Sequence, residues 1–256
     1  MSFTVENLEF YLMIIVRISG FIYTAPFFNL SQVPLRVKAG ITVFLGIMVA
    51  GMLNYAPLEY AGTIGFGGLI IKELMLGVIL GFSSNICMYI LNFAGQLIDM
   101  EIGFSMVNLF DPVSKIQTTI TGNLYSYLVM LMLMVTNMHY YLIRAIVDSF
   151  RAVPVGGVNI PANIYEAFMK FMADYFIIGF RIILPIFAAT LLVNVVLGVL
   201  AKAAPQMNMF VVGMQLKVIV GLAILWMVVD MVPEVSDFIF TEMRGMVTAV
   251  LKVLSS

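Results

Sequence analysis

The stretch "LLVNVVLGVL", residues Leu191–Leu200, is apolar on every side except at Asn194. A second stretch of the same kind, "VMLMLMV", covers Val129–Val135. A strand of a membrane barrel would alternate apolar and polar residues over about 10 positions, because one face meets lipid and the other meets the lumen. Neither stretch alternates, so both predict helices, and the fold class that we expect is all-α.

The whole chain is more apolar than a soluble domain. Of its 256 residues, 62% are hydrophobic and 11% are charged, and the mean hydropathy is +1.06, whereas soluble domains are about half apolar and about a quarter charged. Lipid or other apolar protein must therefore cover much of the surface. The net charge of −1 and the lack of a Lys/Arg run in the sequence exclude a nucleic-acid-binding protein.

Six runs that are free of charged residues, or nearly so, approach or exceed the roughly 18 to 20 residues that span a bilayer as a helix. They are Ile18–Leu35, Ala39–Leu58, Leu74–Ile98, Ile116–Ile143, Ile182–Ala201 and Ala203–Val229, the last broken only by Lys217. The sequence thus predicts an integral membrane protein with five to six long apolar helices. Because Glu6 and Glu9 rather than basic residues precede the first hydrophobic segment, "FYLMIIVRISGFIY" from Phe10 to Tyr23, we expect this segment to remain in the mature protein.

The expected helices follow these runs, with Pro and Gly residues between them. They are Leu8–Phe28, Val37–Tyr55, Leu69–Ile98, Gly122–Asp148, Ile164–Ala201 and Met209–Met231, followed by an amphipathic helix from Pro233 to Ser256. The Gly-rich stretch "GTIGFGG", residues 62–68, is expected to precede the third helix, and Pro185 is expected to kink the fifth. Gly77 and Gly81 form a GxxxG face that lets another helix approach closely.

A central segment, "MEIGFSMVNLFDPVSKIQTTITGN", residues 100–123, interrupts the pattern of long helices. It mixes Gly, Pro, Asp and Asn with Phe, Met and Leu. A surface loop would be more polar than this. An apolar stretch without a helical pattern predicts a loop that is buried in protein or that lines a cavity.

Several charged residues lie inside the apolar runs or at their edges, where a charge that faces lipid is costly. They are Arg17, Lys72, Glu73, Arg181, Lys217 and Asp230. Two interpretations are open: a relay for ions or substrate in a transporter, or ion pairs between the subunits of an assembly. Arg144 and Asp148 stand four residues apart, and we expect only a local pair on one helix face.

Motifs for catalysis or metal binding are missing from the sequence. It contains neither GxxxxGK[ST] nor HExxH. The single Cys87 and the single His139 cannot build a metal cluster, and Ser83, Ser84 and Ser105 would have only His139 as a general base. We therefore expect no enzyme, no metal and no cofactor.

Three blocks of sequence resemble one known family. "VRISGFIYTAPFF" with "VPLRVKAGITVFL" resembles the N-terminal signature of the R subunit of the flagellar export gate, a signature shared with the counterpart in virulence type III secretion systems. A second block is similar to the family's AGxLIDxxxGFxxxxxxDP motif at Ala94, Gly95, Gln96, Leu97, Ile98, Asp99, Gly103, Phe104, Asp111 and Pro112. A third is similar to its C-terminal signature at Asn194, Gly198, Ala204, Pro205, Gln206, Asn208, Phe210, Gly213 and Lys217.

The resemblance implies a non-enzymatic membrane subunit that joins the P and Q subunits of the export gate, and also the B and A subunits of the apparatus. It would lie in the bacterial inner membrane at the flagellar basal body and form the entry to the channel for unfolded export substrates. Residues 1–164 would be similar to a P subunit, and residues 165–256 to the helical hairpin of a Q subunit with a tail. The alternatives are a virulence export-gate subunit and a small-solute secondary transporter, although the sequence shows no internal repeat of the kind found in transporters.

The resemblance also implies candidate sites. The family's plug, a loop that blocks the pore from within, corresponds to Gly103, Phe104, Ser105, Met106, Val107, Asn108, Leu109, Phe110, Asp111 and Pro112. Candidates for subunit interfaces are Arg17, Lys72, Glu73, Arg181, Pro205, Gln206, Asn208 and Lys217. Of these, Gln206 and Asn208 are expected to hydrogen-bond the exposed helix termini beside Pro205.

Overall fold

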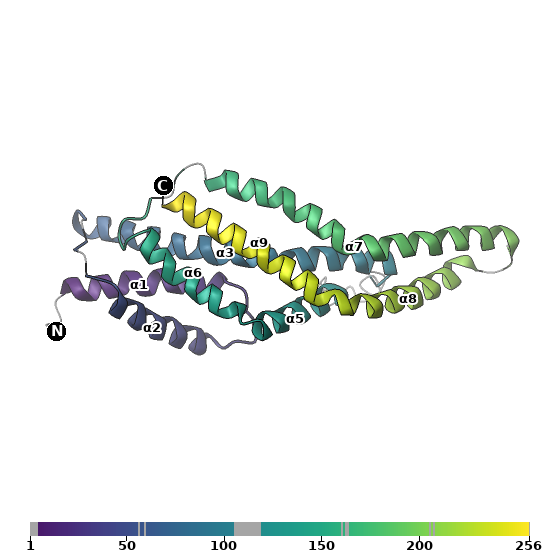
Figure 1. Ribbon diagram of the computed structural model, residues 1–256, viewed down its shortest axis with the longest axis horizontal. Coiled ribbons are helices and arrows are strands. Elements are labelled where there is room, and N and C mark those ends of the chain that lie inside the picture. Colours follow the sequence, from purple (N-terminus) through teal and green to yellow (C-terminus); the bar gives the residue numbers. More distant parts are fainter. Residues whose placement is uncertain are drawn as a thin grey trace. The chain divides into compact units, whose positions relative to one another are not determined.

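The computed structural model describes residues 5–55, 57–58, 60–104, 119–159, 161, 164–204, 206 and 208–255. Every regular element in this part of the chain is a helix, which confirms the all-α prediction. The helices are α1 (Val5–Thr24), α2 (Leu35–Met52), α3 (Gly62–Ile102), α5 (Ile120–Val135), α6 (Met138–Ala152), α7 (Ile164–Ala203), α8 (Met209–Val228), the 3-10 turn η1 (Val229–Met231) and α9 (Val232–Leu254) (Figure 1).

Among the residues that the structure describes, four helical stretches are long and apolar enough to cross a membrane: α2, α3, α7 and the stretch Val211–Leu254, which contains most of α8 and all of α9. The broken pair α5 and α6 counts as a fifth when its two helices are taken together. The length and composition of these helices make the chain a multi-helix membrane protein, as the sequence predicts.

The start of α3 differs from the expectation. The Gly-rich stretch at residues 62–68 does not precede the helix but forms its first turns, because α3 begins at Gly62. Glycine costs about 1 kcal/mol relative to alanine inside a helix. In apolar surroundings a helix is nevertheless the conformation that satisfies every backbone N–H and C=O group, so the glycines continue it.

The expected helix Gly122–Asp148 is also wrong, because the chain forms two helices there. α5 ends at Val135 and α6 begins at Met138. Between them Asn137 has a φ of 59°, in the left-handed region that asparagine tolerates better than most residues. Its N–H donates to the Met134 carbonyl at 3.2 Å, an arrangement that ends a helix.

The last three helices follow the sequence expectation closely. α7 continues as one helix through Pro185, and Figure 1 shows it bending part-way along its length. α8 ends at Val228, and after η1 the chain continues as α9, which is the expected C-terminal helix. The end of α7 and α8 run side by side as a helical hairpin (Figure 1).

The chain divides into two compact units, each built from separate segments. The first contains Met1–Cys87, Met134–Phe171 and Phe240–Ser256, and the second contains Met88–Leu133 and Met172–Ile239. Both units take residues from either side of position 164. The expected division into residues 1–164 and 165–256 concerns likeness to other subunits, and it stays a prediction.

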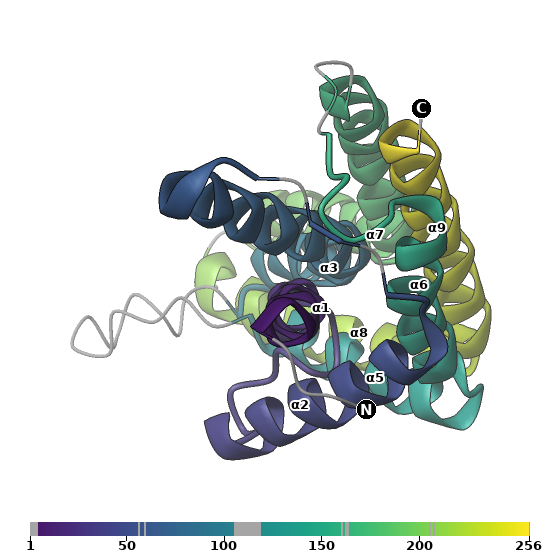
Figure 2. The ribbon, with the colours of Figure 1, turned by 90° about the vertical axis from the view of Figure 1, so that its left-hand side faces the viewer.

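In the first unit α1 is a central helix. Its side chains Met13, Ile14 and Ile18 are fully buried, and Figure 2 shows α2, α3 and α6 on different sides of it. The GxxxG face of α3 contacts α1: a Cβ atom on Gly77 would collide with the Arg17 carbonyl, and one on Gly81 would lie 2.8 Å from the Phe21 carbonyl. The predicted close helix approach is confirmed, and α1 is the helix that makes it.

In the second unit the later part of α3 packs against α5 and α7. Phe93 of α3 contacts three aromatic rings of α7, with centroid distances of 5.7 Å to Tyr175, 5.4 Å to Phe176 and 6.3 Å to Phe180, the last two edge to face. Gly179 lies beneath Phe93, and any larger side chain there would collide with the ring. Aromatic packing thus fixes α7 against α3.

Candidate functional site

A buried ion pair lies in the first unit, between Arg17 of α1 and Glu73 of α3. Both side chains are 0% exposed. Nε of Arg17 lies 2.6 Å from Oε2 of Glu73, and Nη2 lies 3.1 Å from Oε1. The two bonds make a bidentate guanidinium–carboxylate pair, the geometry in which such pairs are strongest.

The remaining donors of Arg17 hold the end of α6. Nη1 donates to the carbonyl oxygens of Ser149 at 3.1 Å and Val153 at 2.9 Å, and the guanidinium lies 4.2 Å from the centre of the Phe150 ring. Oε1 of Glu73 accepts the N–H of Gly156 at 2.8 Å. The pair therefore joins α1, α3 and the C-terminal end of α6, where helix carbonyls need partners.

Arg17 and Glu73 were both expected as subunit-interface candidates. Within the chain they are enclosed in the first unit and paired with each other, and a role for them at an interface stays a prediction. A lone buried charge is very costly, and pairing within the chain removes that cost before assembly.

A second polar group lies in the second unit, where Asp99 of α3 faces the start of α5. Oδ2 of Asp99 accepts the N–H of Ile120 at 2.7 Å, and Oδ1 accepts the N–H of Thr121 at 3.2 Å. Oδ1 also lies 2.6 Å from the Thr121 hydroxyl. Gly95 and Asp99 of α3, together with residues 119–122, are called the Asp99 cluster below.

The local sequence explains this arrangement. The first amides of a helix have no partner within the helix, and a carboxylate is favoured at that end. Thr119 caps α5 in the ordinary way, because its hydroxyl accepts the N–H of Gly122 at 2.9 Å. A Cβ atom on Gly95 would collide with the main chain of Gly122, so α3 and α5 touch backbone to backbone one turn from Asp99.

The expected plug residues lie next to the Asp99 cluster in the sequence. Gly103 follows the last residue of α3 with a φ of +96°, and its N–H donates to the Asp99 carbonyl at 3.1 Å. Phe104 is half-buried. Residues 105–112, the rest of the expected plug, lie outside the described residues.

The other cationic interface candidates are not enclosed. Lys72 and Arg181 are exposed, and Lys217 is half-buried on α8. Within the described part of the chain, the ion pairs involve none of these three side chains. They remain candidates for contact with another subunit.

The turn between α7 and α8 only partly matches the expectation. Asn208 stands at the N-cap position of α8, but its side chain makes no capping bond. Its main-chain carbonyl accepts the N–H of Val211 at 3.1 Å instead. Gln206 is exposed, and Pro205 lies outside the described residues.

The expected pair on α6 is present and lies at the surface. Nε of Arg144 is 3.5 Å from Oδ2 of Asp148, and Arg151 adds a second contact to the same carboxylate at 3.2 Å. All three side chains are more than a third exposed. Exposed pairs of this kind are worth at most about 1 kcal/mol, so the group has a local role.

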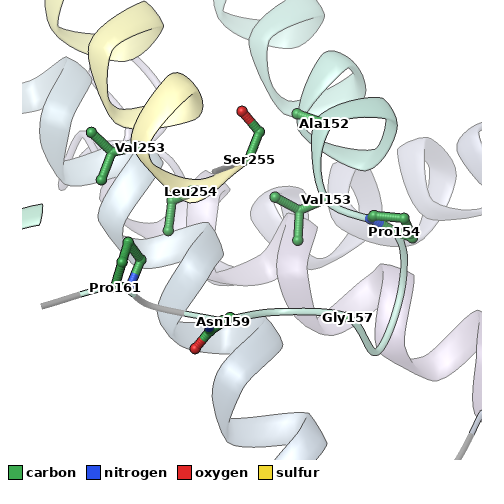
Figure 3. Close-up of a pocket in the computed structure, with 9 residues that line it drawn as sticks. All are labelled: Ala152, Val153, Pro154, Gly157, Asn159, Pro161, Val253, Leu254 and Ser255. Atoms are coloured by element: carbon green, nitrogen blue, oxygen red, sulfur yellow. The ribbon is translucent and has the colours of Figure 1, made fainter.

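A pocket of about 240 Å³ lies in the first unit, between the turn after α6 and the end of α9 (Figure 3). It is lined by Ala152, Val153, Pro154, Gly157, Asn159, Pro161, Val253, Leu254 and Ser255. These side chains carry no charge, so the pocket offers no acid, base or nucleophile pair. Among the described residues there is also no group of three or more potential metal ligands.

Comparison with known proteins identifies the family. Residues 8–243 match the family described as "Bacterial export proteins, family 1". The chain belongs to this family.

This export-family chain is similar to curated proteins over nearly its whole length. It is 30% identical to the flagellar biosynthetic protein FliR of Pectobacterium carotovorum subsp. carotovorum over 243 residues, which cover 94% of this chain and 92% of that relative. It is 30% identical to the FliR of Bacillus subtilis strain 168, with 88% of each chain covered. The FliR of Escherichia coli strain K12 is 26% identical, with 96% of this chain and 94% of that relative covered.

Much of the apolar surface of this family member is left uncovered by the chain itself. In the most apolar 18-residue segment of α3, 61% of the segment is buried, whereas the buried share of the corresponding segment is 22% in α7 and 17% in Val211–Leu254. Large apolar side chains are exposed on these helices, among them Leu192 on α7 and Trp226, which is 80% exposed. Large exposed apolar side chains gathered on long helices indicate contact with lipid or with other protein.

Several residues of the two polar groups were not among the predicted site residues. Asp99 and Gly95 were recognised as family positions but not as site residues. Thr119 and Thr121 on one side, and Ser149 and the Gly156 amide on the other, were not singled out. The one available signal was an acid at the end of the uncharged run Leu74–Ile98, which needs a partner.

Proposed function

We propose that this chain is a subunit of the flagellar protein-export apparatus in the bacterial inner membrane. The observation that carries the proposal is the match to an export-protein family over residues 8–243. The alignments with relatives named flagellar biosynthetic protein FliR, which cover most of both chains, agree with it. The exposed apolar surfaces of α7 and α8 support it, because a subunit in a membrane assembly has lipid and neighbours to cover them.

The proposed partners are the P and Q subunits of the export gate, and also the B and A subunits of the apparatus. In this proposal residues 1–164 take the place of a P-like subunit, and residues 165–256, the helical hairpin with its tail, take the place of a Q-like one. Lys72, Arg181 and Lys217 then supply interface charges, and the turn at residues 205–208 lies at a subunit contact. Unfolded flagellar proteins are the substrates of the assembled channel.

We also propose that residues 103–112 obstruct the passage for substrates. The apolar sequence of this stretch is unsuited to a free surface loop. The Asp99 cluster gives further support, because it joins the end of α3 before the stretch to the start of α5 after it. Deleting residues 103–112 is expected to raise the leak of small solutes through the assembled apparatus, and an unchanged leak would contradict the obstruction.

The function is tested by deleting the gene in its own bacterium and restoring it on a plasmid. We expect the deletion to abolish export of flagellar proteins into the medium, and the plasmid to restore it. Motility is measured in parallel. Normal filaments and export in the deletion strain would refute the proposal, and loss of virulence-protein secretion with intact motility would favour the related virulence system.

A further inference from the structure

We propose that Asp99 is a positioning residue whose carboxylate holds the first turn of α5 against α3. Residues 95–99 and 119–122 all lie in the described part of the chain. The effect of this contact on export rests on the proposed function, whereas the contact itself does not.

The charge of Asp99 is balanced by the α5 terminus. The side chain is 6% exposed, and within the described chain the ion pairs do not include it. Both of its oxygens accept main-chain N–H groups at the start of α5. A buried carboxylate at a helix N-terminus accepts hydrogen bonds from the first N–H groups and interacts favourably with the helix dipole. These contacts offset the free-energy cost of removing the charge from water.

The two helices come closest at Gly95 and Gly122, where the backbones touch because neither residue has a side chain. A close approach of this kind leaves the polar bonds beside it to set where the first turn of α5 lies. The described polar bonds from α3 to the first turn of α5 run through Asp99 and the Thr121 hydroxyl, which also lies 2.7 Å from the Gly95 carbonyl. Removing the Asp99 carboxylate therefore takes away the bonds that hold the first two N–H groups of α5 to α3.

Neighbouring amides provide an internal control. The N–H groups of Ile120 and Thr121 depend on Asp99, but the N–H of Gly122 depends on the Thr119 hydroxyl. A loss of positioning should affect the first two and spare the third. General unfolding of α5 would affect all three alike.

The test is residue-resolved hydrogen exchange on the full chain in lipid nanodiscs, comparing wild type with Asp99→Asn and Asp99→Ala. The control is Glu101→Gln, which alters the nearby acid that accepts a bond from the Thr190 hydroxyl at 3.2 Å. In the Asp99 variants we expect Ile120 and Thr121 to exchange about tenfold to a hundredfold faster, as for a lost bond to a charged group. Gly122 and the amides of α1 should keep their rates, and the control should match wild type. Unchanged exchange at Ile120 and Thr121 in Asp99→Ala would overturn the proposal.

A second pair of variants keeps the test decisive if the Asp99 variants do not fold. Thr121→Val removes the hydroxyl and leaves both bonds from Asp99 to the main-chain N–H groups in place, whereas Thr121→Ser keeps the hydroxyl. Amide exchange at positions 120 and 121 that stays near the wild-type rate in both variants supports the proposal, because the carboxylate still holds these N–H groups. Exchange at least tenfold faster in the valine variant, with rescue by serine, would show that the hydroxyl holds the start of α5 and would overturn the proposal.

Export of flagellar proteins is then measured with Asp99→Asn in the complemented deletion strain. Reduced export at unchanged chain abundance, with normal export for Glu101→Gln, supports the role in export. Normal export with Asp99→Asn overturns that role alone, whereas a wild-type plasmid that fails to restore export overturns the proposed function instead.

Discussion

Replacing Glu73 with Gln keeps the size of the side chain and removes its charge. The Arg17 guanidinium, 0% exposed, would then lie in the first unit without a counter-ion. Breaking a buried pair by removing one partner costs about 3–5 kcal/mol. The converse variant, Arg17→Met, leaves the Glu73 carboxylate with its bond from the Gly156 N–H. We expect either change to lower the free energy of unfolding by about 3–5 kcal/mol.

The double variant Arg17→Met with Glu73→Gln should cost less than either single change, because no charge is left alone and the side-chain amide oxygen at position 73 still accepts the Gly156 N–H. The Val153 carbonyl loses the Arg17 donor, whereas the Ser149 carbonyl keeps the N–H of Val153 at 2.9 Å. One buried acceptor without a donor costs about 1–3 kcal/mol. The two single effects are therefore expected to be strongly non-additive.

The assay follows Cys87, the one cysteine of the chain, which is fully buried. A thiol-reactive dye reports its exposure as the detergent-solubilised protein unfolds on heating. Arg151→Met is the matched control, because the exposed Arg151 pair is worth at most about 1 kcal/mol. A Glu73→Gln protein that unfolds at the same temperature as the wild type would refute the reasoning. So would a double variant whose loss of stability equals the sum of the losses in the two single variants.

Two further predictions concern a contact between helices and a contact between subunits. Gly77→Ala should sharply reduce the yield of folded protein, because the new methyl group collides with the Arg17 carbonyl. The control Gly67→Ala has open space around it and should be neutral or stabilising by up to about 1 kcal/mol. Equal yields and melting temperatures for the two variants would contradict this prediction. Lys217→Ala should leave the melting temperature of the isolated chain unchanged and reduce its co-purification with other export subunits, and an intact, exporting complex would exclude Lys217 from the interface.

The existence of most helices could be predicted from the sequence, because a long uncharged run in an apolar chain has few alternatives to a helix. The breaks were harder to predict. α5 ends because the backbone of Asn137 adopts the left-handed conformation. The apolar run before Asn137 contains no residue that predicts this conformation. Conversely, the glycines at 62–68 suggested a break, but the need to satisfy backbone groups in apolar surroundings continues the helix through them.

The candidate site was predicted only in part, for a physical reason. The charges of Arg17 and Glu73 could be recognised as costly, but the partners are 56 residues apart, and sequence alone does not distinguish pairing within the chain from pairing between chains. The partners of Asp99 are mainly backbone N–H groups. Such donors exist at almost every residue, so no side-chain pattern marks them.

The account depends on the chain working as part of a membrane assembly, and affinity purification of the tagged chain from its own bacterium tests this most directly. We expect a stable complex that contains other membrane subunits of the flagellar export apparatus, and poor recovery of the chain when it is expressed alone. A chain that is monodisperse by itself and moves a small metabolite into liposomes without added subunits would contradict the account.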